Sequence, residues 1–482
     1  MKKYLNILIV IFILIVIGLF TANYFIKNKI ENQLKQEENL EYKDFSFNIL
    51  NGNINLGTAK FSDEKRDIQS KELDINLDLI AYLIDKTLKF NKISTESLDV
   101  VWKKTQTSSK SDKPEDVIII QKIDIKKANF QYQDEGKTLF SLKNINLFGE
   151  DITWPMKDEM AWVNSVEMTS GALSYDMNNL HDLKFESLNI NEGNIEISKF
   201  QIEPKYTKSN YIEEISTEKD WMDLTTETIE INNFSVEKTD SNNNFSIKNI
   251  LFSNSDFVIY RDKTIADDKS IKPLYSESLR SLDFDLNIDS IQVINLDITY
   301  QELLDKGANP AEIKFNKIDA NIANIHNFEK DEPEMITTKA SAEFSKSSAI
   351  YFNYSFDPMD ESDKFSVDTK VVNVSDSSVN SFFAPALSMK LDGKIDDLSS
   401  KMNSQNTSAS GTFQMAYEKL KIKVLSKDGS ERSFASLLSN VFVQNKDVDV
   451  EHKIENIERD QNKSFWNYVW KFIQSGIKKT LL

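Results

Sequence analysis

The sequence predicts a mainly β protein in which one N-terminal transmembrane helix is followed by an elongated, U-shaped antiparallel β-groove and a C-terminal amphipathic helix. Three observations predict this fold class: an uncharged apolar run at the amino terminus, many short segments of alternating apolar and polar residues, and a basic aromatic segment at the carboxyl end. Alternation with a period of two is typical of strands that are buried on one face.

The amino-terminal run carries the membrane prediction. No charged residue occurs from Tyr4 to Ile26. These 23 residues would span about 35 Å as a helix, enough for a hydrocarbon core of about 30 Å. A cleaved signal peptide is the alternative, but the segment Phe20–Tyr24 is a poor cleavage site. We therefore expect residues 1–26 to form a short cytoplasmic stub and an uncleaved signal-anchor.

The segment that follows the anchor keeps helical spacing. Ile26, Ile30 and Leu34 recur every four residues, which predicts a juxtamembrane helix over residues 27–40. The alternating segments begin beyond it, and we expect the β-groove to occupy residues 41–460. About twenty strands are expected there, which at about 4.8 Å per strand would make a sheet about 100 Å long.

One spacing recurs in the β-rich part, with apolar residues at positions 1, 3, 8 and 10 of each copy. Because the interval from 3 to 8 is odd, an unbroken strand would turn the second pair to the opposite face, so the chain must bulge or bend between the pairs. Each copy thus predicts a bent strand with one apolar face, although an ordinary antiparallel meander also yields alternating pairs. The copies are Phe47, Ile49, Ile54 and Leu56; Ile123, Ile125, Phe130 and Tyr132; Val166, Met168, Leu173 and Tyr175; Leu188, Ile190, Ile195 and Ile197; and Ile291, Val293, Ile298 and Tyr300.

Bent strands laid side by side would enclose an apolar interior. The candidate residues of this apolar interior are Phe47, Ile49, Ile54, Ile123, Ile125, Phe130, Tyr132, Ile291, Val293, Ile298 and Tyr300.

The carboxyl-terminal segment 463–482 predicts an amphipathic helix, because its apolar residues recur three and four apart. It holds four lysines and no acidic residue, a composition typical of helices that lie in membrane interfaces. The alternative is that its apolar face covers the open end of the groove and the last strand edge. Membrane contact would use Trp466, Trp470, Lys471, Lys478 and Lys479, whereas a covering helix would use Phe465, Val469, Phe472 and Ile473.

Composition excludes several functions. With 58 basic and 76 acidic side chains, the 482-residue chain has a formal charge of −18, which argues against nucleic acid as a partner. Cys is absent, and the three histidines stand far apart at His181, His326 and His452. Disulfides, metal sites and His-based triads are therefore not expected. No phosphate loop or hydrolase motif is present, so we expect neither an enzyme nor a cofactor.

Three stretches carry a resemblance to a known family. They are LDINLDLIAYLIDKTLKFNKISTESLDVVW (73–102), which follows the anchor, the repeat pair within 282–325, and FFAPALSMKLDGKIDDLSSKM with ASGTFQMAYEKLKIKVL (382–425), read as strands that include Gly411, Phe413, Met415 and Tyr417. Together they resemble the AsmA-like family of Gram-negative envelope proteins, relatives of TamB. This resemblance implies an inner-membrane protein with its bulk in the periplasm and a groove that binds phospholipid. The candidate residues of the apolar interior would then line a lipid groove and shield acyl chains from water, at about 0.8 kcal/mol for each buried CH₂ group.

Two functions follow as hypotheses. The first is an anchored conduit or holder of phospholipid that contributes to lipid transport or outer-membrane assembly, as the resemblance implies. The second is a non-enzymatic envelope scaffold that binds other envelope proteins and fills the groove with its own side chains. The width of the interior separates the two, because a filled interior leaves no room for acyl chains.

Overall fold

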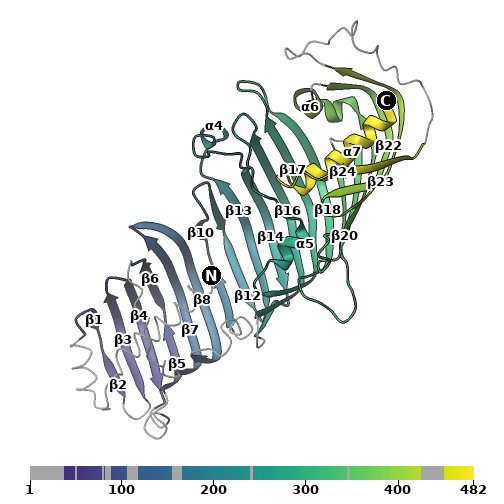
Figure 1. Ribbon diagram of the computed structural model, residues 1–482. Helices are drawn as coiled ribbons and strands as arrows, with labels where there is room; N and C mark the ends of the chain where they lie inside the picture. Colours follow the sequence, from purple (N-terminus) through teal and green to yellow (C-terminus); the bar gives the residue numbers. More distant parts are fainter. Residues whose placement is uncertain are drawn as a thin grey trace. The chain divides into compact units, whose positions relative to one another are not determined.

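The computed structural model describes residues 37–48, 52–78, 81, 88–105, 118–154, 166–238, 243–344, 348–387, 389–424 and 450–481. The chain is mainly β, as predicted, and these residues contain 24 strands (Figure 1). It divides into two compact units: unit 1 comprises residues 1–200 and 231–241, and unit 2 comprises residues 201–230 and 242–482.

Unit 1 is built from short and long strands that pair mainly with their sequence neighbours. The strands are β1 (Leu40–Lys43), β2 (Ser46–Asn48), β3 (Asn53–Ser62), β4 (Arg66–Leu77), β5 (Leu88–Thr95), β6 (Ser97–Lys103), β7 (Ile118–Asp134), β8 (Lys137–Trp154), β9 (Val166–Ser170), β10 (Leu173–Asp176), β11 (His181–Phe185), β12 (Ser187–Asn191), most of β13 (Asn194–Pro204), the end of β14 (Trp221–Asn232) and β15 (Ser235–Lys238). Several long strands face two short ones in series: β7 pairs with β5 and β6, and β8 pairs with β9 and β10.

Unit 2 has longer strands and contains the helices α4, α5, α6 and α7. Its elements are α4 (Lys208–Tyr211), most of β14, β16 (Asn243–Asp262), α5 (Tyr275–Arg280), β17 (Asp285–Leu303), β18 (Ala311–His326), β19 (Ile336–Phe344), β20 (Ser348–Phe356), β21 (Phe365–Ser375), α6 (Asp376–Leu387), β22 (Met389–Ser404), β23 (Ser408–Val424), β24 (His452–Glu458) and α7 (Phe465–Leu481). β14 pairs with β16, and from β16 to β24 each strand pairs with the next.

The predicted bend is present in the long strands. Lys127 in β7 and Asn295 in β17 both adopt positive φ. The pairing register shifts between Ile125 and Phe130, and again between Val293 and Ile298. The extra residue of each bulge returns the second apolar pair to the face of the first. The bent-strand prediction is therefore confirmed for the copies at 123–132 and 291–300.

Polar side chains satisfy the backbone along these bulges. In unit 2 the amide of Asn295 donates to Asn254 at 2.9 Å, while its backbone N–H donates to Asp319 at 3.0 Å. In unit 1 the backbone N–H of Lys127 donates to Asn146 at 3.2 Å. Because a bulge leaves ladder groups unpaired, Asn and Asp beside it replace the missing bonds.

Two copies of the spacing are hairpins instead. Leu188 pairs with Ile197 and Ile190 with Ile195 across β12 and β13, and the turn between them has positive φ at Glu192 and Gly193. A two-residue turn of this type reverses the chain, so positions 1 and 10 face each other. Phe47 likewise pairs with Ile54 across β2 and β3. The bend prediction is wrong for these two copies.

The copy at 166–175 is a strand interrupted at its middle. β9 ends at Ser170 and β10 begins at Leu173, and both pair with β8 on the same side. The backbone N–H of Gly171 donates to the carbonyl of Lys143 at 2.8 Å across this break. This copy therefore confirms a bend, although two strands flank it.

The sheet is mixed, so the prediction of antiparallel pairing throughout is wrong. β5 and β6 run parallel to β7, and β16 runs parallel to β17. Two consecutive strands that run parallel require a crossover connection, which brings the chain back to the end of the sheet where the first strand began. For β16 and β17 this crossover is the segment 263–284, which contains α5 and is called the strap below.

Two other sequence expectations change. The first strand of the third family-like stretch is in part a helix, because α6 extends to Leu387. The helix predicted over 27–40 does not reach residue 40: residues 38 and 39 form a turn, and Leu40 begins β1 by pairing with Phe61.

The predicted anchor over residues 1–26 and the predicted juxtamembrane helix up to residue 36 lie outside the described residues. Within the ranges given above, no helix combines the length and hydropathy that are needed to cross a bilayer.

Candidate functional site

The candidate site is the inner face of the sheet, defined as the face that carries the buried apolar residues of each unit. In unit 1, Ile123, Ile125 and Phe130 of β7 all lie in this core. Phe130 pairs with Val100 on β6 and Leu142 on β8. Both apolar pairs of the copy therefore share one face, as the spacing predicts.

The other described candidates of unit 1 belong to the same core or pack against it. Ile54 is buried on β3, and Phe47 and Tyr132 are partly buried and pack against the core. Ile49 lies outside the described residues. The inner face here is closely packed, since Phe90 and Ile93 are 0% exposed.

The inner face of unit 2 is more open. On β17, Ile291, Val293, Ile298 and Tyr300 are all partly buried, and only Ile291 packs against the buried core. The outward Ile294 on the same strand is 49% exposed. The sequence prediction therefore places these four residues on one face, and the structure leaves that face incompletely covered.

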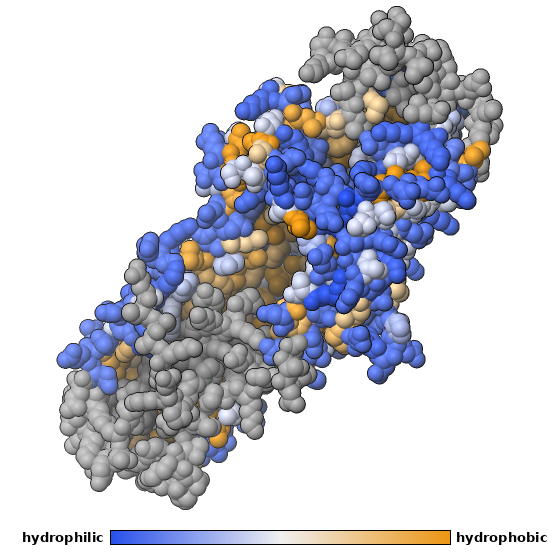
Figure 2. Space-filling view, viewed as in Figure 1, coloured by the Kyte–Doolittle hydropathy of each residue, from blue (hydrophilic) through white to orange (hydrophobic). Residues whose placement is uncertain are grey.

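The neighbouring strands extend this surface in register. Ile298 lies between Phe257 on β16 and Phe315 on β18, and Ile291 lies between Ile250 and Ile322. Apolar residues thus meet apolar residues across three strands on both sides of the bulge. Figure 2 shows apolar residues on the floor of a hollow, with polar residues along its rims.

One polar pair interrupts the apolar surface. Thr226 on β14 and Ser255 on β16 are buried, and their hydroxyl oxygens lie 3.0 Å apart. Because each hydroxyl is a hydrogen-bond partner for the other, the pair avoids the penalty of an unsatisfied buried polar group. The register places Ser255 beside Leu296, on the inner face.

The helix α7 lies against β22, β23 and β24 (Figure 1). Its apolar side chains Phe465, Tyr468, Val469 and Phe472 are part of the unit 2 core, and Phe472 is 0% exposed. Gly476 lets the helix approach closely, because a Cβ there would lie 2.2 Å from the ring of Phe413. The residues predicted for the covering role therefore face the sheet.

The residues predicted for membrane contact lie elsewhere on the helix. Trp466 is 56% exposed, although its ring lies 5.3 Å from that of Phe352. Trp470 is partly buried, with its ring 6.0 Å from that of Phe383. These two positions thus differ in exposure, and Trp466 is the one that solvent reaches.

The lysines of α7 are mostly engaged with the sheet. Lys471 and Lys479 each donate at 2.7 Å to a backbone carbonyl of β24, those of Glu458 and Lys453, and Lys478 is exposed. Two of the three predicted lysines therefore satisfy carbonyl groups of the last described strand.

The strap crosses unit 2 on the inner side of the sheet. Leu274 is buried in the same core as α7, and the ring of Tyr275 lies 5.3 Å from that of Phe465. The backbone N–H of Lys272 donates to the carbonyl of Gln461 at 2.8 Å. The strap and the segment before α7 thus hold each other above the inner face.

A buried ion pair fixes the strap to one rim. Arg280 of α5 bonds to Asp363 at 2.5 Å, and the carboxylate of Asp363, 4% exposed, also accepts from Ser276 at 2.6 Å. Asn406 reaches the same carboxylate at 3.3 Å and accepts from Arg459 at 2.7 Å. This network joins the strap, two loops between strands and the segment before α7.

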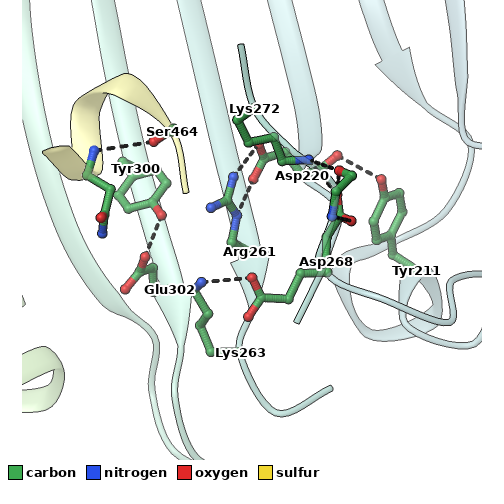
Figure 3. Close-up of polar contacts among 12 residues, drawn as sticks. Tyr211, Asp220, Arg261, Lys263, Asp268, Lys272, Tyr300, Glu302 and Ser464 are labelled. Atoms are coloured by element: carbon green, nitrogen blue, oxygen red, sulfur yellow. Dashed lines mark hydrogen bonds and ion pairs between the residues drawn. The ribbon is translucent and has the colours of Figure 1, made fainter. Parts of the chain in front are cut away.

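Charged residues gather at the other rim, where β16 ends (Figure 3). The guanidinium of Arg261 donates to both carboxylate oxygens of Asp220, at 2.7 Å each. The hydroxyl of Tyr300 donates to Glu302 at 2.5 Å. We call Asp220, Arg261, Tyr300 and Glu302 the rim cluster; the composition pointed to no such cluster, and only the register brings it together.

Burial and charge set the protonation of the rim cluster. Burial disfavours the charged form of Arg261, but the hydrogen bonds and charge of Asp220 outweigh it and raise the pKa of Arg261. Burial is also the main cause that raises the pKa of Tyr300, and the adjacent Glu302 carboxylate adds to it. Arg261 is therefore a cation and Tyr300 a neutral donor at physiological pH.

Among the described residues, no group of His, Asp or Glu side chains is arranged to hold a metal ion. No family model and no curated protein matches the sequence.

Proposed function

We propose that this chain is a membrane-anchored periplasmic protein that holds the acyl chains of phospholipids on the inner face of unit 2. In this proposal residues 1–26 anchor it in the inner membrane of a Gram-negative bacterium. It contributes to lipid transport or outer-membrane assembly, in the manner that the resemblance to AsmA-like proteins implies.

The observation that carries the proposal is the partly exposed apolar floor of β16, β17 and β18. Phe257, Ile298 and Phe315 form one row across these strands, and each is only partly buried. A solvated apolar face of this kind gains about 25 cal/mol for each Å² that a ligand covers. Hydrocarbon chains match such a surface because they need no polar partner.

The scaffold remains the second candidate, and the packing of unit 1 favours it there. Phe90, Ile93 and Phe130 are at most 1% exposed, so this part of the inner face offers acyl chains little surface. In the scaffold hypothesis the inner face serves stability, and other envelope proteins bind elsewhere on the chain. The two hypotheses therefore differ in whether lipid contacts unit 2.

A photo-crosslinking amino acid at position 298 tests the proposal. In cells, a probe replacing Ile298 should capture phospholipid, while a probe replacing the outward Ile294 should capture much less. Both positions are isoleucines on β17, so the comparison controls for expression and for strand position. Equal capture at both positions, or no lipid at either, would contradict lipid binding on this face and favour the scaffold.

A further inference from the structure

We propose that the rim cluster is a headgroup site for a zwitterionic phospholipid of the phosphoethanolamine type. Arg261 would bind the phosphate and Glu302 the ammonium group, while the acyl chains lie on the apolar floor. This inference rests on the proposed function and specifies which lipid the inner face of unit 2 accepts.

The order of residues along the strands supports a headgroup site at the rim. On β16 the inner positions Phe257 and Ile259 lead directly to Arg261, and on β17 Ile298 and Tyr300 lead to Glu302. Successive inner positions are two residues apart in a strand. Each apolar row therefore ends in a charged residue at the rim. A phospholipid has the same order of groups, because its apolar acyl chains end in a charged headgroup.

The spacing of the two charges matches a zwitterionic headgroup. Arg261 and Glu302 are register partners on adjacent parallel strands, so their backbones lie about 4.8 Å apart. A phosphate and an ammonium joined by a short ethylene link match neighbouring sites of opposite charge. A headgroup with phosphate alone would leave Glu302 facing an anion.

Both charges retain capacity for further hydrogen bonds. Asp220 accepts from two N–H groups of Arg261, and a guanidinium has five. The other three have no partner within the described ranges. Glu302 accepts from Tyr300 and forms no ion pair with any described residue. Guanidinium and phosphate form strong charge-assisted hydrogen bonds.

Strap anchoring does not account for this pair. The partners of Arg261 and Glu302 are Asp220 and Tyr300, which lie outside residues 263–284. The strap is held through other residues: Lys263 bonds to Glu218 at 2.8 Å, and Lys272 and Arg280 bond further along. Arg261 and Asp220 are 27% and 33% exposed, so a headgroup reaches them from solvent.

The test measures binding of three lipids with identical acyl chains to the purified full-length protein: phosphatidylethanolamine, phosphatidylglycerol and diacylglycerol. Arg261→Met should weaken both phospholipids about tenfold and leave diacylglycerol unchanged. Glu302→Gln should weaken phosphatidylethanolamine about tenfold and spare phosphatidylglycerol. Lys314→Met, on the outer face of β18, is the matched control and should change none of the three.

Glu302→Gln keeps the shape of the side chain, so this variant still tests the headgroup site if Arg261→Met fails to fold. An unchanged ratio of phosphatidylethanolamine to phosphatidylglycerol binding in Glu302→Gln would overturn the headgroup site. Equal loss of diacylglycerol binding in a folded Arg261→Met protein would do the same. If the unmodified protein binds none of the three lipids, the proposed function itself fails.

Discussion

Single residues decide where the long strands bend. Lys127 and Asn295 occupy the left-handed region of φ, which costs a non-glycine residue roughly 1–2 kcal/mol. Asn tolerates this region better than most residues because its short side chain bonds locally. At Asn295 the same side chain also donates to Asn254 on the parallel neighbour, so one residue provides both the bend and a link across it.

Substitutions of Asn295 should separate these two contributions. Asn295→Val should lower the free energy of unfolding by about 1–2 kcal/mol, because a β-branched residue is strained at positive φ. Asn295→Gly should cost less than Asn295→Val, since Gly removes the strain and loses only the amide bond. Urea denaturation followed by circular dichroism measures both. A valine variant as stable as the glycine variant would show that the bulge does not persist in solution.

A second residue-scale prediction concerns Asp363, which is almost fully buried in its ion pair with Arg280. Asp363→Asn should lower the free energy of unfolding by about 3 kcal/mol, because it leaves a buried cation without its counter-charge. Asn accepts the positive φ of this position, so backbone strain contributes little. Asp360→Asn in the same loop is the control and should cost less than about 1 kcal/mol. Equal effects of the two variants in denaturant titrations would exclude a special role for the buried pair.

Among the elements, α7 is a part of the core more than a free amphipathic helix. Its apolar face contacts β22 and β23, and two lysines bond to carbonyl groups of β24. Ser464 caps its start, accepting from the N–H of Asn467 at 3.3 Å. An apolar face that already packs on protein is unavailable to a bilayer while the helix stays docked.

Two aromatic residues of α7 should therefore respond differently to truncation. Phe472→Ala should lower the free energy of unfolding by about 3–5 kcal/mol, since it removes a fully buried ring. Trp466→Ala should cost less than about 1 kcal/mol, because the side chain is mostly exposed. Thermal denaturation compares the two variants. If Trp466→Ala is the more damaging change, α7 does not pack as described.

The role of the strap cannot be predicted from local residue patterns. Apart from α5, no helix or strand lies within 263–284. Its role follows from β16 and β17 being parallel, which obliges the chain to return across the sheet. Residue patterns do not reveal strand direction, since parallel and antiparallel neighbours both use alternating apolar residues.

On the scale of the whole chain, the net charge bears on how the protein attaches to a membrane. The formal charge of −18 repels anionic membrane surfaces, so residues 1–26 are the expected source of membrane attachment. We predict that all residues after Ile26 lie in the periplasm. A reporter enzyme that is active only outside the cytoplasm, fused after Leu482, should be active. A stable but inactive fusion would contradict this topology.

The sequence by itself determined the mainly β fold, the carboxyl-terminal helix and the bends at Lys127 and Asn295. The fold class and the helix follow from the period at which apolar residues recur. The bends follow from the odd interval between positions 3 and 8 of each copy. Both properties belong to residues close together in the sequence. The candidates Ile291, Val293, Ile298 and Tyr300 were found for the same reason. The hairpin at Glu192 was misjudged because a tight turn and a bulge occupy the same interval.

Tertiary structure alone decided which strands are parallel, where the strap crosses and which face of α7 is buried. It also decided that Phe130 is closed in while Ile298 stays partly exposed, although their copies share one spacing. Burial depends on what other segments cover, and pairing direction depends on the path between strands. Arg261 meets Asp220 and Glu302 only because register aligns residues about 40 positions apart, a long-range relation that no local pattern contains.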